Sequence, residues 1–198
     1  GRSREFCEWA LPLWQQHFPE NMKGVSAEAL WQAVNLVEPS LIRVEADEAT
    51  YNLHVMIRYE IEKRLIAGEL EVDDLPDAWD DMYEEFLGVR PPNRALGVLQ
   101  DIHWSMGAFG YFPTYTLGNL YAAQLLATAR NDLPHHDEQI RRGEFAPLLA
   151  WMRDHVHQRG SILEPAALIE EATGSPPSPD AFVDYLRDKV ELLYGVSA

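Results

Sequence analysis

The sequence predicts a mostly α-helical protein, and three observations support this fold class. Apolar residues recur at helical spacing along nearly the whole chain, as in the N-terminal stretch REFCEWALPLW. Alternating apolar and polar patterns, which are typical of strands, are scarce and short. Glycine and proline residues interrupt the periodic stretches, which predicts a series of separate helices.

The periodic stretches predict helices over nine segments whose ends are uncertain by a few residues. Ser26 can cap the first turn of the second helix with its hydroxyl group. Gly68 supplies the left-handed residue that commonly ends a helix, and Pro179 prevents a helix from starting before Asp180. The expected segments are about 3–17, 26–37, 46–67, 77–88, 114–131, 136–142, 144–158, 164–173 and 179–194.

The longest gap between these helices, residues 89–113, is rich in glycine, proline, aromatic and polar residues. Long irregular segments in compact domains are usually functional or disordered, and the aromatic content argues against disorder. We therefore expect one ordered irregular segment that lines a cleft. The chain has no internal repeat or obvious linker, so it is expected to form a single domain.

Composition limits the classes of function. The chain has 198 residues, of which 46% are hydrophobic and 11% aromatic, as in folded globular proteins. Thirty-two acidic against sixteen basic residues give a net charge of -16, which disfavours nucleic-acid binding. This acidity either attracts cationic ligands or only keeps the surface solvated. The sequence has no long apolar run and a single cysteine, Cys7, so we expect a cytoplasmic protein without a membrane span.

The segment IRVEADEATYNLHVMIRYEIE, residues 42–62, is the first candidate site. On a helix, its polar residues would form one stripe, while the other faces are apolar and therefore buried. One interpretation is that Arg43 captures a carboxylate with its planar guanidinium. The alternative is a buried ladder of ion pairs, in which Arg43 pairs with Asp47 and His54 with Arg58. The whole stripe consists of Arg43, Asp47, Tyr51, His54 and Arg58.

The segment GVLQDIHWSMGAFGYFPTYTLGN, residues 97–119, is the second candidate site. His103 can exchange a proton near neutral pH, and Tyr111 and Tyr115 offer phenolic donors. Asp101 could orient His103, although it is only two residues away. The alternative is that His103 is an ordinary core histidine packed beside a tryptophan.

The chain is not expected to bind a metal ion by itself. The remaining histidine clusters lack the paired spacing of the HExxH zinc motif, which occurs nowhere in the sequence. Phosphate-binding GxxxxGK[ST], nucleophilic GxSxG and dinucleotide-binding GxGxxG motifs are also missing from the sequence. The clusters in question comprise His135, His136 and Asp137, and His155 with His157.

Two longer motifs resemble signatures of one peptidase family. IRxxAD occurs as residues 42–47 and GxxQDxHW as residues 97–104, each matched at every fixed position. The chain is similar, from Gly1 to about Gly195, to the carboxypeptidase Taq family of HExxH zinc carboxypeptidases. The resemblance implies a helical lobe of a larger all-α metallopeptidase fold.

The same resemblance implies that residues 1–198 are a single C-terminal fragment of the catalytic domain. The HExxH and HES motifs that hold zinc in the family would precede Gly1, so zinc belongs to the intact parent and not to this chain. The isolated chain is then expected to be inactive. The parent is expected to act on peptides with a free C-terminus and to form a homodimer.

Roles for individual residues also follow from the resemblance. Arg43 would bind the terminal carboxylate of the substrate, and His103 with Tyr111 or Tyr115 would hydrogen-bond the scissile amide or the tetrahedral intermediate. The expected positioning residues are Asp47, Gln100, Asp101 and Trp104. The alternatives are a non-catalytic helical domain that binds peptides and a lobe that serves dimerisation.

Overall fold

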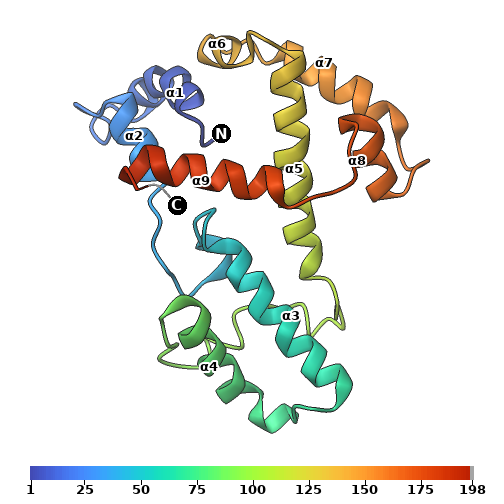
Figure 1. Ribbon diagram of the computed structural model, residues 1–198. Helices are drawn as coiled ribbons and strands as arrows, with labels where there is room; N and C mark the ends of the chain where they lie inside the picture. The colour runs from blue at the N-terminus through green and yellow to red at the C-terminus, as the bar shows by residue number, and fades with distance from the viewer. Residues whose placement is uncertain (197–198) are drawn as a thin grey trace. The chain divides into compact units, whose positions relative to one another are not determined.

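The computed structural model describes residues 1–196, which form nine α-helices and three short 3₁₀-helices (Figure 1). No strand occurs within this range. The 3₁₀-helices are η1 (Arg43–Glu45), η2 (Val72–Asp74) and η3 (His157–Arg159). The α-helices are α1 (Arg4–His17), α2 (Ala27–Val34), α3 (Tyr51–Ala67), α4 (Leu75–Leu87), α5 (Pro113–Asp132), α6 (His136–Arg141), α7 (Ala146–His155), α8 (Pro165–Thr173) and α9 (Asp180–Tyr194).

Each predicted helix has a counterpart, and local chemistry explains several of the ends. The Ser26 hydroxyl accepts a hydrogen bond from the Ala29 amide at 3.1 Å and caps α2. Gly68 ends α3 with a φ of 70°, in the left-handed region. Pro179 directly precedes α9, as the sequence predicts.

The third helix begins later than predicted, at Tyr51 instead of near residue 46. The Asp47 carboxylate accepts hydrogen bonds from the Ala49 amide at 2.8 Å and from the Thr50 amide at 3.0 Å. These bonds fold residues 47–50 into a turn that leads into α3, as an aspartate before a helix commonly does. Arg43 therefore lies on the separate helix η1, and the predicted stripe is not a single helical face.

The contacts divide the chain into two compact units, and the second unit consists of residues 37–119. Its core forms where α3 packs against α4, the two helices of the lower part of Figure 1. The segment between α4 and α5 is irregular, as predicted. The buried core residues are Ile57, Ile61, Leu70, Trp79, Tyr83 and Leu87.

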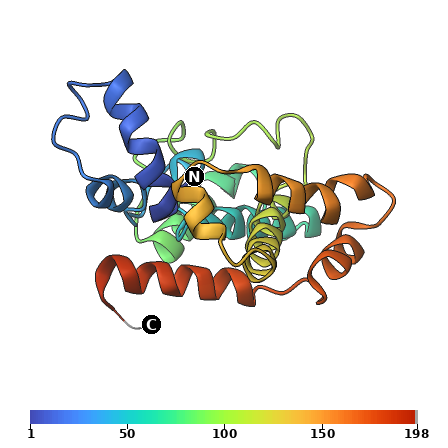
Figure 2. The ribbon, with the colours of Figure 1, turned by 90° about the horizontal axis from the view of Figure 1, so that it is seen from above.

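The first unit consists of residues 1–36 and 120–198, so the boundary falls within α5. Helix α1 contacts both α2 and α6, and Leu193 near the end of α9 packs on the core between α1 and α2. Figures 1 and 2 both show that the chain continues from α7 into α8, on the side away from α1 and α2, and then turns back into α9. The buried core residues are Cys7, Leu11, Leu30 and Trp31.

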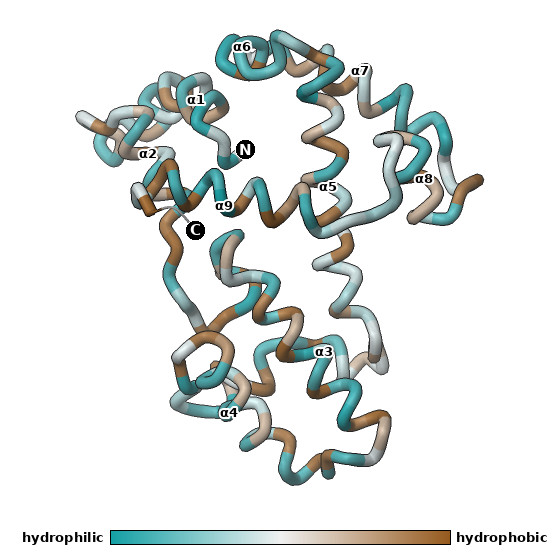
Figure 3. The backbone as a smooth tube through the Cα atoms, in the orientation of Figure 1, coloured by the Kyte–Doolittle hydropathy of each residue, from teal (hydrophilic) through white to brown (hydrophobic). Residues whose placement is uncertain are grey.

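Hydrophobic and hydrophilic residues are interspersed along α1 and α9 in Figure 3, as in amphipathic helices. Among the described residues, no helix combines the length and the apolar character needed to cross a membrane. The expectation that the whole chain is a single domain fragment stays a prediction.

Candidate functional site

The two motifs of the sequence meet inside the second unit. Helix η1 carries Arg43 from the first motif, and the irregular segment before α5 carries Gln100 and Asp101 from the second. Arg58 joins them from the second turn of α3. These four side chains form one hydrogen-bonded cluster, which we call the arginine cluster.

Asp101 is the centre of the arginine cluster. Its Oδ1 accepts a hydrogen bond from Nη2 of Arg43 at 2.7 Å, and Nε of Arg43 donates to the same oxygen at 3.2 Å. Its Oδ2 accepts a hydrogen bond from Nε of Arg58 at 2.6 Å. Arg43 is 5% exposed and Arg58 is fully buried, so these pairs form with little water around them.

Gln100 fixes the spacing between the two arginines. Its side-chain oxygen accepts from the Arg43 amide at 3.0 Å and from Nη2 of Arg58 at 2.9 Å. Its side-chain nitrogen donates to the Leu41 carbonyl at 2.9 Å. Gln100 thus connects two segments, residues 41–43 and helix α3.

The charges of the cluster hold Asp101 in its ionised form. Burial disfavours the charged carboxylate, but the hydrogen bond from Arg43 and the charges of Arg58 and Arg43 outweigh it. The pKa of Asp101 therefore lies below its ordinary value of 3.8. The pKa of Arg43 is raised, because its bonds to Asp101 and Tyr51 outweigh the effect of burial.

The charged residues of the first motif and α3 do not pair as the ladder interpretation predicts. The Asp47 carboxylate bonds to the backbone amides of Glu38, Ala49 and Thr50, and to the Thr50 hydroxyl, rather than to Arg43. Arg58 contacts His54 through the backbone carbonyl, at 2.8 Å, rather than through its imidazole ring. The aspartate that pairs with Arg43 is 58 residues away in the sequence.

His103, Tyr111 and Tyr115 lie together at the edge of the arginine cluster. Nε2 of His103 is 3.1 Å from the Tyr115 hydroxyl, and the His103 and Tyr111 rings are 5.7 Å apart. Nδ1 of His103 is buried without a hydrogen-bond partner among residues 1–196, and it lies 3.8 Å from Asp101. This separation is too long for a hydrogen bond, so Asp101 does not orient His103 in that way.

Trp104 anchors the end of the second motif to the core. Its indole nitrogen donates to Glu62 Oε1 at 2.7 Å, and its ring packs edge-on against Trp79 at 5.9 Å. Trp79 also lies against the guanidinium of Arg58, at 4.5 Å from the ring centroid. Trp104 therefore supports the arginine cluster through the core.

The site does not have the ligands of a metal centre. Asp101 is saturated by two cations, which would also repel a third, and Nε2 of His103 faces a tyrosine hydroxyl. In the described part of the chain, no group of three or more histidine, cysteine, aspartate or glutamate side chains is arranged to hold an ion. Two histidines of the other clusters have their own contacts: His136 bonds to Asp137 at 2.8 Å, and His155 stacks on Trp151 at 4.2 Å.

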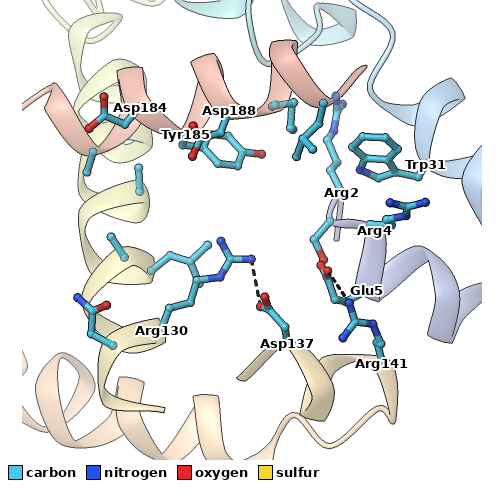
Figure 4. A pocket seen from close by; sticks show the side chains of 18 of the residues that line it. Arg2, Arg4, Glu5, Trp31, Arg130, Asp137, Arg141, Asp184, Tyr185 and Asp188 are labelled. Atoms are coloured by element: carbon cyan, nitrogen blue, oxygen red, sulfur yellow. Dashed lines mark hydrogen bonds and ion pairs between the residues drawn. The ribbon is translucent and has the colours of Figure 1, made fainter. Parts of the chain in front are cut away.

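A cavity of about 860 Å³ lies in the first unit, between α1, α5, α6 and α9 (Figure 4). Ion pairs line it, including Arg130 with Asp137 at 3.2 Å and Arg141 with Glu5 at 3.1 Å. None of the side chains predicted for the site lines this cavity.

Comparison with known proteins identifies the family. The model of the carboxypeptidase Taq (M32) metallopeptidase family matches residues 1–190. This chain belongs to that family. The resemblance inferred from the two motifs is therefore confirmed.

Individual M32 relatives agree with this assignment. Over 195 residues the chain is 50% identical to thermostable carboxypeptidase 1 of Thermus thermophilus, and over 194 residues it is 43% identical to carboxypeptidase 1 of Bacillus subtilis. These matches cover 98% of this chain but only 38% and 39% of the relatives. The chain thus spans less than half the length of the relatives that it matches.

Solved structures show the same relation. The M32 carboxypeptidase of Deinococcus radiodurans superposes with a TM-score of 0.95 at 44% identity, over 99% of this chain and 40% of that structure. Metallocarboxypeptidase 1 of Trypanosoma cruzi superposes with a TM-score of 0.90 at 38% identity, over 96% of this chain and 38% of its own. The chain is a helical portion of a larger all-α M32 fold, as predicted.

Two residues of the arginine cluster and its surroundings lie outside the two motifs. Arg58 lies outside both motifs, and only its place in the polar stripe indicated it. Tyr83, whose hydroxyl lies 3.1 Å from Nδ1 of His54 and 3.2 Å from Nη1 of Arg58, carried no signal in the sequence. It comes from α4, which the motifs do not include.

Proposed function

We propose that this chain is the part of a metallocarboxypeptidase that holds the C-terminal end of a peptide, and that the longer enzyme releases single C-terminal amino acids. Membership of the M32 family supports a carboxypeptidase as the parent protein. The observation that carries the proposal is the hydrogen bonding of Arg43. Its guanidinium is ion-paired with Asp101, but some of its N–H donors are not used by the contacts in the structure.

A guanidinium has five N–H donors. Three of those of Arg43 are used: Nε and Nη2 donate to Asp101, and Nη1 donates to the Tyr51 hydroxyl at 3.0 Å. One N–H group on each terminal nitrogen is left by these contacts. We propose that this pair binds the terminal carboxylate of the substrate, because a carboxylate accepts two such bonds side by side.

His103, Tyr111 and Tyr115 are the proposed groups for the scissile amide. They lie beside Arg43, whose guanidinium carbon is 4.9 Å from the Tyr115 ring centroid. In an exopeptidase the scissile bond is one residue from the terminal carboxylate. A donor next to Arg43 is thus suitably placed to stabilise negative charge on the amide oxygen. Asp47, Gln100, Asp101 and Trp104 are proposed to position these groups.

The metal of the parent enzyme is proposed to be zinc, held by residues outside these 198. The isolated chain is then inactive. We expect the purified chain to hold no stoichiometric zinc and to release no amino acid from a peptide. The longer gene product should hold about one zinc ion and release single C-terminal residues. Metal analysis and a carboxypeptidase assay on both proteins test this, and stoichiometric zinc with cleavage by the 198-residue chain would contradict it.

Replacing Arg43 tests the carboxylate role. In the longer gene product, Arg43→Ala should lower kcat/KM for a peptide with a free C-terminus by roughly 10- to 100-fold, the usual loss for hydrogen bonds to a charged group. The matched measurement uses a non-peptidic ester substrate that lacks the terminal carboxylate, for which the variant should match the wild type. An unchanged kcat/KM on the free acid would rule out the role.

Replacing His103 tests its proposed contact with the scissile amide. His103→Ala in the longer gene product should lower kcat by roughly 100-fold, as loss of a donor to an oxyanion does, and leave the zinc content unchanged. Loss of zinc from the variant would mean that His103 supports the metal site instead.

If the longer gene product binds peptides without cleaving them, the alternative of a non-catalytic binding domain replaces the enzyme. The homodimer and the cytoplasmic location remain predictions.

A further inference from the structure

We propose that Arg58, which lies outside both motifs, is a positioning residue for Arg43: by sharing the Asp101 carboxylate it leaves Arg43 with positive charge for a ligand. The proposal rests on the carboxylate role of Arg43 proposed above. Arg58 never meets the ligand in this scheme, since it is fully buried.

The hydrogen bonds to the two carboxylate oxygens show how Arg43 and Arg58 share Asp101. Nη2 of Arg43 donates to Oδ1 of Asp101 at 2.7 Å, and Nε of Arg58 donates to Oδ2 at 2.6 Å. Nε of Arg43 also donates to Oδ2, at the longer distance of 3.4 Å, so the two arginines share this oxygen. If Arg58 were missing, Asp101 could turn fully toward Arg43 and neutralise it as a one-to-one pair. With Arg58 present, two guanidinium groups share one carboxylate, and the cluster of ion pairs carries one surplus positive charge.

Arg58 is fixed so that it cannot leave this arrangement. Its Nη1 donates to the His54 carbonyl at 2.8 Å, and its Nη2 donates to Gln100 at 2.9 Å. Its guanidinium carbon lies 4.5 Å from the Trp79 ring centroid. Arg43 is the member of the pair that retains some exposure, so the surplus charge is available to a ligand at Arg43.

The neighbouring titratable groups do not cancel this surplus through ion pairs. The Asp47 carboxylate accepts hydrogen bonds from backbone amides and from Thr50, and Glu62 accepts one from Trp104. Within residues 1–196, neither carboxylate forms an ion pair with Arg43 or Arg58. His54 is neutral at pH 7 and adds no charge.

A purely structural role for Arg58 would be the competing explanation. A buried ion pair is often no more stabilising than apolar residues of similar volume, so fold stability alone does not explain a second buried arginine. The two explanations differ in what they predict when Asp101 is neutralised together with Arg58. The charge explanation expects recovery of binding, whereas the structural explanation expects a further loss.

The experiment measures binding of N-acetylglycine to the 198-residue chain by NMR titration, with N-acetylglycinamide as the uncharged reference. Wild-type chain should bind the acid more tightly than the amide, and Arg43→Gln should remove this preference. Arg58→Gln should weaken binding of the acid roughly tenfold, because Asp101 then neutralises Arg43. Arg58→Lys, which keeps the charge, should stay within about threefold of the wild type.

The decisive variant is the double replacement Arg58→Gln with Asp101→Asn, which restores the surplus charge without the ion pairs. It should bind the acid within about threefold of the wild type. Arg90→Gln is the matched control, since Arg90 is an exposed arginine of the same unit paired with Asp81 and Glu84. It should bind as the wild type does. Circular dichroism and thermal melting of each variant check that it is folded.

Three results would overturn the proposal. If Arg58→Gln binds the acid like the wild type while Arg43→Gln does not, Arg58 has no such role and the proposed role of Arg43 stands. If the double variant binds no better than Arg58→Gln, the role of Arg58 is structural. If wild-type chain does not prefer the acid, or Arg43→Gln keeps the preference, the carboxylate site fails together with this inference.

Discussion

Burial changes the chemistry of single side chains in this protein, and His54 is the clearest example. It is fully buried on α3, and its pKa falls from the ordinary 6.5 to about 4. Burial is the main cause, and the positive charges of Arg58 and Arg43 add to it. The imidazole is therefore neutral at pH 7, with Nδ1 bonded to the Tyr83 hydroxyl at 3.1 Å.

The lowered pKa of His54 predicts a particular loss of stability in acid. The unfolded chain takes up the proton near pH 6.5 and the folded chain only near pH 4, so protonation favours unfolding between these values. The stability present above pH 6.5 should fall by roughly 3 kcal/mol as the pH drops to 4. Urea unfolding at several pH values measures this loss. His54→Asn should remove that part of the slope, and replacement of the exposed His17 by Gln should not.

The packing of the turn between α6 and α7 against α1 depends on a single glycine. Gly143 lies in the turn between α6 and α7 with a φ of 74°, and a Cβ atom there would come within 2.2 Å of the Trp9 ring on α1. Trp9 cannot easily move away, because its ring lies 5.3 Å from that of Phe6 and 4.8 Å from that of Phe145. The absence of a side chain at this one position thus lets the turn approach α1.

Replacing Gly143 by Ala should be unusually destabilising for a change of one methyl group. The left-handed backbone alone costs about 1 kcal/mol for a residue with a Cβ atom, and the clash with Trp9 should bring the total loss to roughly 3 kcal/mol. Gly68→Ala is the control, since Gly68 has a similar φ of 70° but no atom near the added Cβ. Chemical denaturation of both variants measures the difference, and equal losses would mean that Trp9 adjusts freely.

Charge is the property that acts on the whole molecule. A net charge of -16 on 198 residues makes the folded chain repel itself, and dissolved salt screens this repulsion. The arginine cluster is a local exception, with two guanidinium groups and one carboxylate inside an acidic protein. It is also buried, so salt should affect it less than the surface.

Salt should therefore stabilise this protein at neutral pH. Raising sodium chloride from about 20 mM to about 300 mM should increase Tm by a few degrees at pH 7, because screening relieves the repulsion. Near the isoelectric point the same increase in salt should leave Tm almost unchanged. Thermal melting at both pH values is the measurement. A fall in Tm at pH 7 would mean that the exposed ion pairs outweigh the repulsion.

The sequence by itself determined the helical fold class, the approximate position of each helix and the family. These properties depend on residues that are close in the chain, such as the periodic apolar positions, the Ser26 cap and the two motifs. Even the five-residue error at the start of α3 came from a local competition, since Asp47 bonds to the backbone that the helix would have used.

Only the tertiary structure decided which charges pair. Spacing along the chain suggested Asp47 as the partner of Arg43, whereas folding brings Asp101 from 58 residues away and adds Arg58 from α3 and Tyr83 from α4. An ion pair forms where side chains meet in space, and the path of the irregular segment between α4 and α5 follows from packing rather than from a periodic pattern. The two motifs therefore indicated Arg43, Gln100 and Asp101, but the sequence indicated neither Tyr83 nor which side chains pair.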